Sequence, residues 1–258
     1  MSSALILMLP ALVAGLLILT SHVIMGRQVL RRGIIFIDLA IAQIAALGAV
    51  AAVSVPWLAD LAWVQWWLPL LFALIGALFI AGLERIASAE LEALIGSLYV
   101  LSAALAVLLL SHDPHGHERL GQLLSGQILW INWSDLGLPT LLTGAFLWLW
   151  YWRPHWLNGR AFYPIFAVMI TWSVAIVGIY LVFASLILPA LAINRLGMAR
   201  LCYGYGIGAL SYGLGLLASL YWDLPAGSAI VALLVFHTGL VRGCWAWWVR
   251  TRQPLPQY

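Results

Sequence analysis

The sequence predicts an all-α, polytopic integral membrane protein with about eight to nine transmembrane helices. Of its 258 residues, 64% are hydrophobic and 8% are charged, whereas a soluble domain carries roughly 45–50% apolar and about 25% charged residues. The mean hydropathy of +1.02 agrees with this assignment. We therefore expect a single transmembrane domain over residues 1–258, with no separate soluble catalytic or nucleotide-binding domain.

Eight apolar stretches are candidates for the transmembrane helices, since about 20 apolar residues span a bilayer. The strands of a membrane barrel would alternate apolar and polar residues. These stretches are apolar on all sides, so we expect helices. They cover Ala4–Met25, Ile34–Val55, Leu61–Leu83, Ala93–Leu110, Leu136–Trp152, Tyr163–Ile193, Tyr203–Tyr221 and Ala226–Trp248.

The sixth stretch, Tyr163–Ile193, is too long for one crossing, because a helix of that length would extend about 46 Å against a hydrocarbon core of about 30 Å. Gly178 lies near its middle. If the chain breaks there and returns, eleven of the twelve arginines fall on one side and Arg119 alone on the other. That asymmetry is typical of the positive-inside rule. It predicts about nine crossings of a bacterial cytoplasmic membrane, with the N-terminus outside and the C-terminus inside.

The same topology predicts the connecting segments. One large loop, Ser111–Asp135, lies outside, and shorter inner loops lie at residues 26–33, 84–92, 153–162 and 194–201. Tryptophans gather at the ends of the stretches, as is typical of interfacial anchors. The two cysteines, Cys202 and Cys244, provide neither a disulfide framework nor a metal-ligand pair.

Asp38 and Gln43 are the candidate path residues. Asp38 lies four residues into the second stretch, and an ionisable residue within a membrane span is a candidate functional site. Gln43 follows five residues later, which we expect to be near the same face. Two interpretations of Asp38 remain open. It is either a carboxylate that holds a divalent cation in a transport path, or a boundary residue paired with Arg31 or Arg32.

A second candidate metal site lies in the outer loop. His112, His115 and His117 alternate with Asp113 and Glu118, and imidazole and carboxylate groups are zinc ligands. The proline and glycine of this tract predict a loop. A solvated polar loop with no metal is the alternative, because short histidine-rich tracts are only compositional signals.

Other chemistry is weakly indicated. His22 and His237 are lone histidines on apolar helices, where hydrogen-bonded packing residues are commoner than ligands. The sequence has no nucleophile elbow, no phosphate-binding glycine loop and no HExxH pattern. We therefore expect a protein that is not itself an enzyme.

Three segments resemble a known family in their order and spacing. They are GRQVLRRGIIFIDLAIAQIAALG (Gly26–Gly48), VGIYLVFASLILPALAINRL (Val177–Leu196) and WDLPAGSAIVALLVF (Trp222–Phe236). The segment Leu120–Leu136 and the absence of a Walker motif also fit. Together these segments resemble the permease subunits of ABC importers for zinc, manganese and iron, the ABC-3 family, over nearly the whole chain.

The resemblance implies partners and a cargo. It implies a homodimer or a pair of related permeases, a separate cytoplasmic ATPase subunit that hydrolyses ATP, and a periplasmic or lipoprotein metal-binding protein. The cargo would be a divalent metal, with Zn²⁺ favoured over Mn²⁺, and no covalently bound cofactor is expected. Nucleic acid is not an expected partner.

The resemblance also identifies site residues and two departures. The family carries an aspartate, matched by Asp38, and a histidine four residues later, where this chain has Ala42. The inner segment that couples to the ATPase is short here, Trp152–Pro164, and its candidate coupling residues are Arg153, His155 and Arg160. Two alternatives to metal import remain: an ABC permease for a non-metal or metal-chelate substrate, and a stand-alone ion-coupled secondary carrier.

Overall fold

The computed structural model describes residues 2–61, 63–87, 89–126, 128–194 and 201–252. Over those residues the chain forms helices and no strand, which confirms the all-α prediction. The longer helices are α1 (Ser2–Arg32), α2 (Ile37–Ser54), α4 (Val64–Ile86), α5 (Leu91–Leu110), α7 (Gly137–Trp152), α9 (Phe162–Val177), α10 (Ile179–Ile193), α11 (Leu201–Trp222) and α12 (Ala226–Arg252). The shorter ones are α3 (Pro56–Ala59), α6 (Gly116–Ser125), α8 (Pro154–Asn158) and the 3₁₀ turns η1 (Ile128–Trp130) and η2 (Trp133–Leu136).

Each apolar stretch of the sequence coincides with one helix, except the sixth, which forms two. Among the described residues, six helices are long and apolar enough to cross a membrane: α1, α2, α4, α5, α11 and α12. The helices α9 and α10 are apolar but shorter. A polytopic membrane protein is therefore confirmed, while the number of crossings and their orientation stay predictions.

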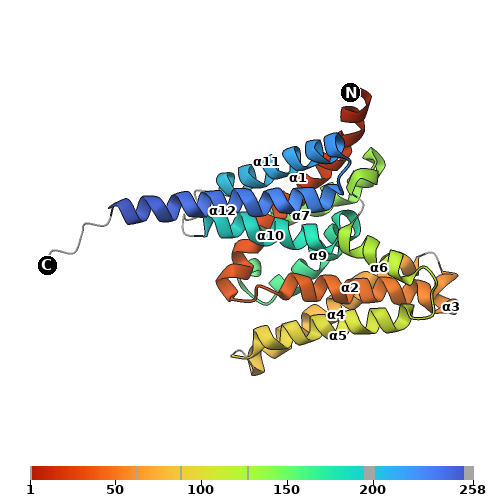
Figure 1. Ribbon diagram of the computed structural model, residues 1–258. Helices are drawn as coiled ribbons and strands as arrows, with labels where there is room; N and C mark the ends of the chain where they lie inside the picture. Colours follow the sequence, from red (N-terminus) through yellow and green to blue (C-terminus); the bar gives the residue numbers. More distant parts are fainter. Residues whose placement is uncertain (1, 62, 88, 127, 195–200, 253–258) are drawn as a thin grey trace.

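The sixth stretch breaks at Gly178, as the sequence predicts. Gly178 ends α9 and begins α10 with a φ of 81°, a left-handed conformation that glycine adopts without steric cost. The start of α9 lies beside Arg32, which stacks on Phe162, and the far end of α10 packs closely on Gly26. Both ends therefore lie near the C-terminal end of α1, and the two helices form a hairpin (Figure 1).

The outer loop contains a helix that the sequence analysis did not predict. Helix α6 occupies Gly116–Ser125, so His117 and Glu118 lie in its first turn and not in a loop. Its leucines recur at helical spacing, which overrides the turn signal of the proline and glycine before them. Helix α6 ends at Gly126, which packs backbone against backbone on Gly178. The outer segment thus reaches the tip of the α9–α10 hairpin.

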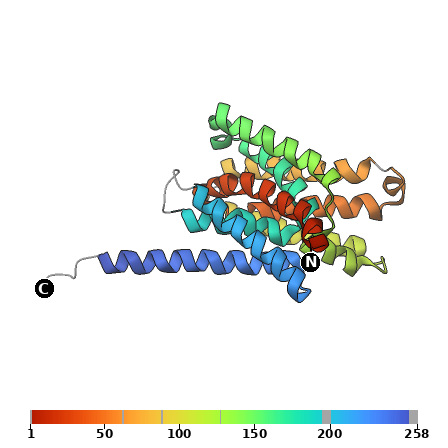
Figure 2. The same ribbon diagram turned by 90° about the horizontal axis from the view of Figure 1, so that it is seen from above.

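The helices form two groups that α9 joins (Figure 1). Helix α2 packs on α4 and α5, while α1 packs on α10 and α11, and α12 covers α10 and α11. Helix α9 contacts both α4 and α10. Seen from above, α7 and α12 lie at opposite edges of the bundle (Figure 2). Large apolar side chains such as Leu78, Leu108 and Phe236 are exposed on the outside, as expected of helices that face lipid.

The two ends of the bundle collect the segments that the predicted topology assigns to opposite sides. Arg32 at the end of α1 contacts Glu84 of α4 and the backbone of residues 157–159, so these segments share one end, which we term the inner end. Trp63, the residue before α4, and Trp66 of α4 lie beside Trp130 and Asp135 at the other end. Most of the predicted inner loop at 194–201, with Arg195 and Arg200, lies outside the described residues.

Candidate functional site

Asp38 lies in the first turn of α2, near the inner end of the bundle. Its side chain is 1% exposed, and neither carboxylate oxygen has a partner in hydrogen-bonding geometry. Asp38 lies at the N-terminal end of the helix, where the helix dipole favours negative charge. Arg32 pairs with Glu84 instead, and Arg31 forms no ion pair with Asp38. The boundary ion-pair interpretation of Asp38 is therefore wrong.

A stripe of small side chains runs along α2 from Asp38. At 3.6 residues per turn, Ala42, Ala45 and Ala49 project on the same face as Asp38. Gln43 does not, because five positions place it about 140° around the helix axis, so the expectation that it lies near the face of Asp38 is wrong. Gln43 is buried, and its role as a path residue stays a prediction at another side of the helix.

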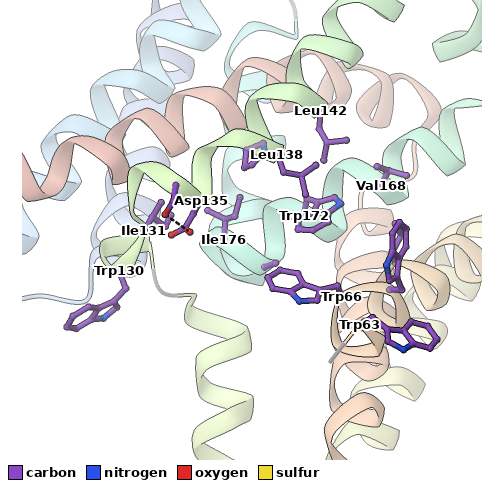
Figure 3. A pocket seen from close by; sticks show the side chains of 15 residues that line it. Trp63, Trp66, Trp130, Ile131, Asp135, Leu138, Leu142, Val168, Trp172 and Ile176 are labelled. Atoms are coloured by element: carbon purple, nitrogen blue, oxygen red, sulfur yellow. Dashed lines mark hydrogen bonds between the residues drawn. The ribbon is translucent and has the colours of Figure 1, made fainter. Parts of the chain in front are cut away.

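A large cavity opens at the outer end of the bundle, and we term it the tryptophan cavity. Its volume is about 870 Å³. Figure 3 shows indole rings from α4, η1 and α9 around it, with Asp135 at its edge. The Asp135 carboxylate accepts hydrogen bonds from the Asn132 backbone N–H and from Ser134 Oγ, so it is engaged in the turn at η2. The lining residues include Trp63, Trp66, Trp67, Trp130, Asp135 and Trp172.

A stacked pair of indoles separates this cavity from a smaller one. The rings of Trp66 on α4 and Trp172 on α9 lie 6.1 Å apart between centroids at an interplanar angle of 22°. Both residues also line the smaller cavity, of about 150 Å³, whose floor includes Ala45 and Ala49 of α2. The smaller cavity therefore reaches the alanine stripe, and the same face of α2 carries Asp38 about 10 Å further along the helix.

Arg32 organises the opposite, inner end. Its guanidinium is 3.3 Å from Glu84 Oε1 and donates to the carbonyl oxygens of Asn158 and Gly159, each at 2.8 Å. Gln28, one turn earlier on α1, donates to Asn158 Oδ1 at 2.8 Å. These bonds attach the short helix α8 to α1 and α4. The candidate coupling residues Arg153, His155 and Arg160 lie around α8 and are exposed.

The outer histidines do not form a preformed metal site. Asp113 receives a hydrogen bond from the His115 backbone N–H and pairs with Arg119 at 3.1 Å, while His112 Nδ1 lies 3.1 Å from Ser111 Oγ. Among the described residues, no group of three or more His, Cys, Asp or Glu side chains is placed to hold a metal ion. Metal binding by His112, His115 and His117 stays a prediction.

The two lone histidines are separate packing residues. His22 is buried in α1, with Nδ1 3.3 Å from Ser21 Oγ. His237 in α12 lies 2.8 Å from Ser211 Oγ of α11. The absence of any three-residue acid or histidine group in the described part of the chain shows that His22, Asp38 and His237 do not meet. This removes the geometric basis for an intramembrane enzyme built on them.

Comparison with known proteins identifies the family. The model of the ABC 3 transport family matches residues 4–158 and 158–241. The chain belongs to this family. The fold resembles that of PsaBC from Streptococcus pneumoniae, solved in complex with a Fab, with a TM-score of 0.71, 18% identity, and coverage of 91% of this chain and 90% of that one. No curated protein matches the sequence.

An ABC-3 permease is the membrane-spanning transport subunit of an ABC transporter. Asp38 is predictable from the sequence, whereas two roles at the inner end were not predicted: Arg32 as an anchor and Glu92 as a carboxylate beside α2. Glu92 opens an apolar stretch, and acids there are easily taken for loop residues. A carboxylate directly at the start of a span is the sequence signal that was available.

Proposed function

We propose that this chain is the permease subunit of an ABC importer for a divalent transition metal in the bacterial cytoplasmic membrane. The observation that carries the proposal is Asp38, a buried carboxylate without a hydrogen-bond partner at the end of a face that begins at the outer cavities. A cation would offset the cost of burying that charge. The sequence alone favours zinc over manganese.

The proposed transport cycle is alternating access. A periplasmic or lipoprotein binding protein delivers the metal at the outer end, where the Trp66–Trp172 pair lies across the route. Beyond that pair the metal reaches Asp38 along the alanine stripe. A second permease protomer, in a homodimer, contributes the other half of the path. Closure of the ATPase subunits on ATP then opens the inner end.

The inner end provides the surface for the ATPase. Helix α8 has only five residues, so the ATPase would contact a short helix and not a long coupling helix. Arg32, with 15% of its side chain exposed, joins α8 to α1 and α4. A displacement of α8 is therefore transmitted to α1, which leads into α2 and Asp38, and to α4, whose first turn lines the outer cavity.

Replacing Arg32 with Ala should uncouple the ATPase from transport. The substitution removes the ion pair and the carbonyl contacts that hold residues 157–159, each charge-assisted bond contributing roughly 1.5–3 kcal/mol. We expect uptake to fall at least about tenfold while cargo-stimulated ATP hydrolysis is lost. The measurement is uptake and ATPase activity of the assembled transporter in proteoliposomes.

Arg31→Ala is the matched control, because Arg31 is the exposed neighbour with the same charge. Arg32→Lys separates charge from geometry, since one ammonium lacks the fork of donors of a guanidinium. If Arg32→Ala left stimulated hydrolysis at the level of Arg31→Ala, α8 would not be a coupling element.

The function itself is tested by cellular metal content. A deletion strain and its complemented counterpart are starved of metal, and zinc, manganese and iron are measured by mass spectrometry. We expect a selective loss of one metal in the deletion strain. Uptake should also require the co-expressed ATPase, and uptake by the chain alone would favour a secondary carrier instead.

The tryptophan cavity supports one alternative cargo. Its volume of about 870 Å³ far exceeds that of a bare ion, and its indoles would suit the organic part of a metal chelate. Unchanged content of all three metals in the deletion strain, with retained ATPase dependence, would favour this chelate or another organic substrate.

A further inference from the structure

Glu92, a half-buried residue, places a second carboxylate at the end of α2 that carries Asp38. It lies in the first turn of α5, and its Oε1 accepts a hydrogen bond of 3.0 Å from the backbone N–H of Phe36, the residue before α2. Phe36 is two residues before Asp38 in the chain, so that bond holds Glu92 close to the start of α2. Its other oxygen, Oε2, is buried and without a hydrogen-bond partner.

Three carboxylate oxygens at this end of α2 are thus buried without hydrogen-bond partners, both of Asp38 and one of Glu92. Among the described residues the ion pairs are Arg32–Glu84 and Asp113–Arg119, so no arginine there neutralises either acid. Uncompensated buried charges are strongly unfavourable, and the arrangement is balanced when a cation lies between the two carboxylates.

The donor atoms determine which cation suits this place. Asp38 and Glu92 offer oxygen alone, and Ala42 offers no ligand. Imidazole and thiolate select zinc-type ions, whereas carboxylate, carbonyl and water oxygens suit magnesium, calcium and manganese. Selectivity among divalent metals depends on ligand type, geometry and availability more than on raw affinity.

We infer that Glu92 is the second cargo ligand beside Asp38, and that the oxygen-only pair takes a hard divalent cation of the manganese type. The inference rests on the proposed function, which it extends by a residue and a metal class. Glu92 on α5 replaces a ligand on α2 itself. The site therefore joins two helices, and their separation would release the metal inward.

Glu92→Gln tests the inference, because the amide oxygen still accepts from Phe36 N–H while the charge is lost. The full chain in lipid nanodiscs is titrated with Mn²⁺, and free Mn²⁺ is followed by electron paramagnetic resonance. Loss of a residue that only supports a metal ligand costs about 10- to 100-fold in affinity, so loss of a ligand should weaken Mn²⁺ binding at least about tenfold. Glu90→Gln, an exposed acid two residues away, should stay within about twofold of wild type.

Metal content measured in cells distinguishes a failure of the inference about Glu92 from a failure of the proposed function. In the complemented deletion strain, Glu92→Gln should lower manganese content and leave zinc unchanged. If Asp38→Asn abolished metal uptake and Glu92→Gln did not, Glu92 would be a helix cap and the inference would be overturned with the function intact. A loss of zinc and not manganese would overturn the metal class. If neither variant changed any metal, the proposed function itself would fail.

Discussion

Asp38→Asn should abolish metal uptake while leaving the fold at least as stable as wild type. The amide has nearly the same shape, but it removes a negative charge that is 1% exposed and has no partner in hydrogen-bonding geometry. Removing one member of a desolvated charge pair costs about 2–5 kcal/mol, which corresponds to roughly 30-fold to several thousand-fold in cargo affinity. The measurement is initial metal uptake by the complemented deletion strain.

Thermal unfolding in detergent separates this effect from misfolding. A buried carboxylate without a counterion opposes folding, so the unfolding midpoint of Asp38→Asn should equal or exceed that of wild type. Asp60→Asn is the control, because Asp60 is an exposed acid beyond the end of α3, and its uptake should be unchanged. Wild-type uptake by Asp38→Asn would exclude Asp38 from the transport path.

The helical framework was predictable because hydrophobicity over about 20 residues depends on the sequence alone. Arginine asymmetry added the break near Gly178, a feature that apolar length by itself leaves undecided. Helix α6 escaped prediction because Pro114 and Gly116 give a turn signal, while its apolar residues matter only once they pack on α5 and α9. The prediction of a loop there was wrong, because the helical spacing of the leucines and their tertiary packing outweigh the turn signal.

The candidate site was predictable only where a single residue type signalled it. A carboxylate inside an apolar run identifies Asp38 without any structure. Glu92 and Arg32 act through contacts with residues 56 and 126 or 127 positions away along the chain, and no periodicity encodes such distances. The cavity at the outer end likewise depends on how α4, α7 and α9 meet. Its tryptophans had the appearance of interfacial anchors.

Gly178→Ala should destabilise the fold severely, because the tip of the α9–α10 hairpin has no room for a side chain. A Cβ at residue 178 would lie 2.6 Å from both the Gly126 Cα and the Ser125 carbonyl carbon, and backbone atoms do not move aside as a flexible side chain does. The φ of 81° adds roughly 1–3 kcal/mol of backbone strain, and overpacking adds typically about 1–3 kcal/mol. The combined cost is a large part of the roughly 5–15 kcal/mol that stabilises a typical fold.

The unfolding midpoint in detergent should therefore fall sharply for Gly178→Ala. Gly121→Ala is the matched control, since an added Cβ on that α6 glycine meets no atom within 4 Å and alanine favours a helix interior. Its midpoint should stay the same or rise slightly. An unchanged midpoint for Gly178→Ala would mean that α6 does not press on the hairpin tip. The outer segment and the α9–α10 break would then be independent, so movement of α6 would not be transmitted to the hairpin tip at Gly178.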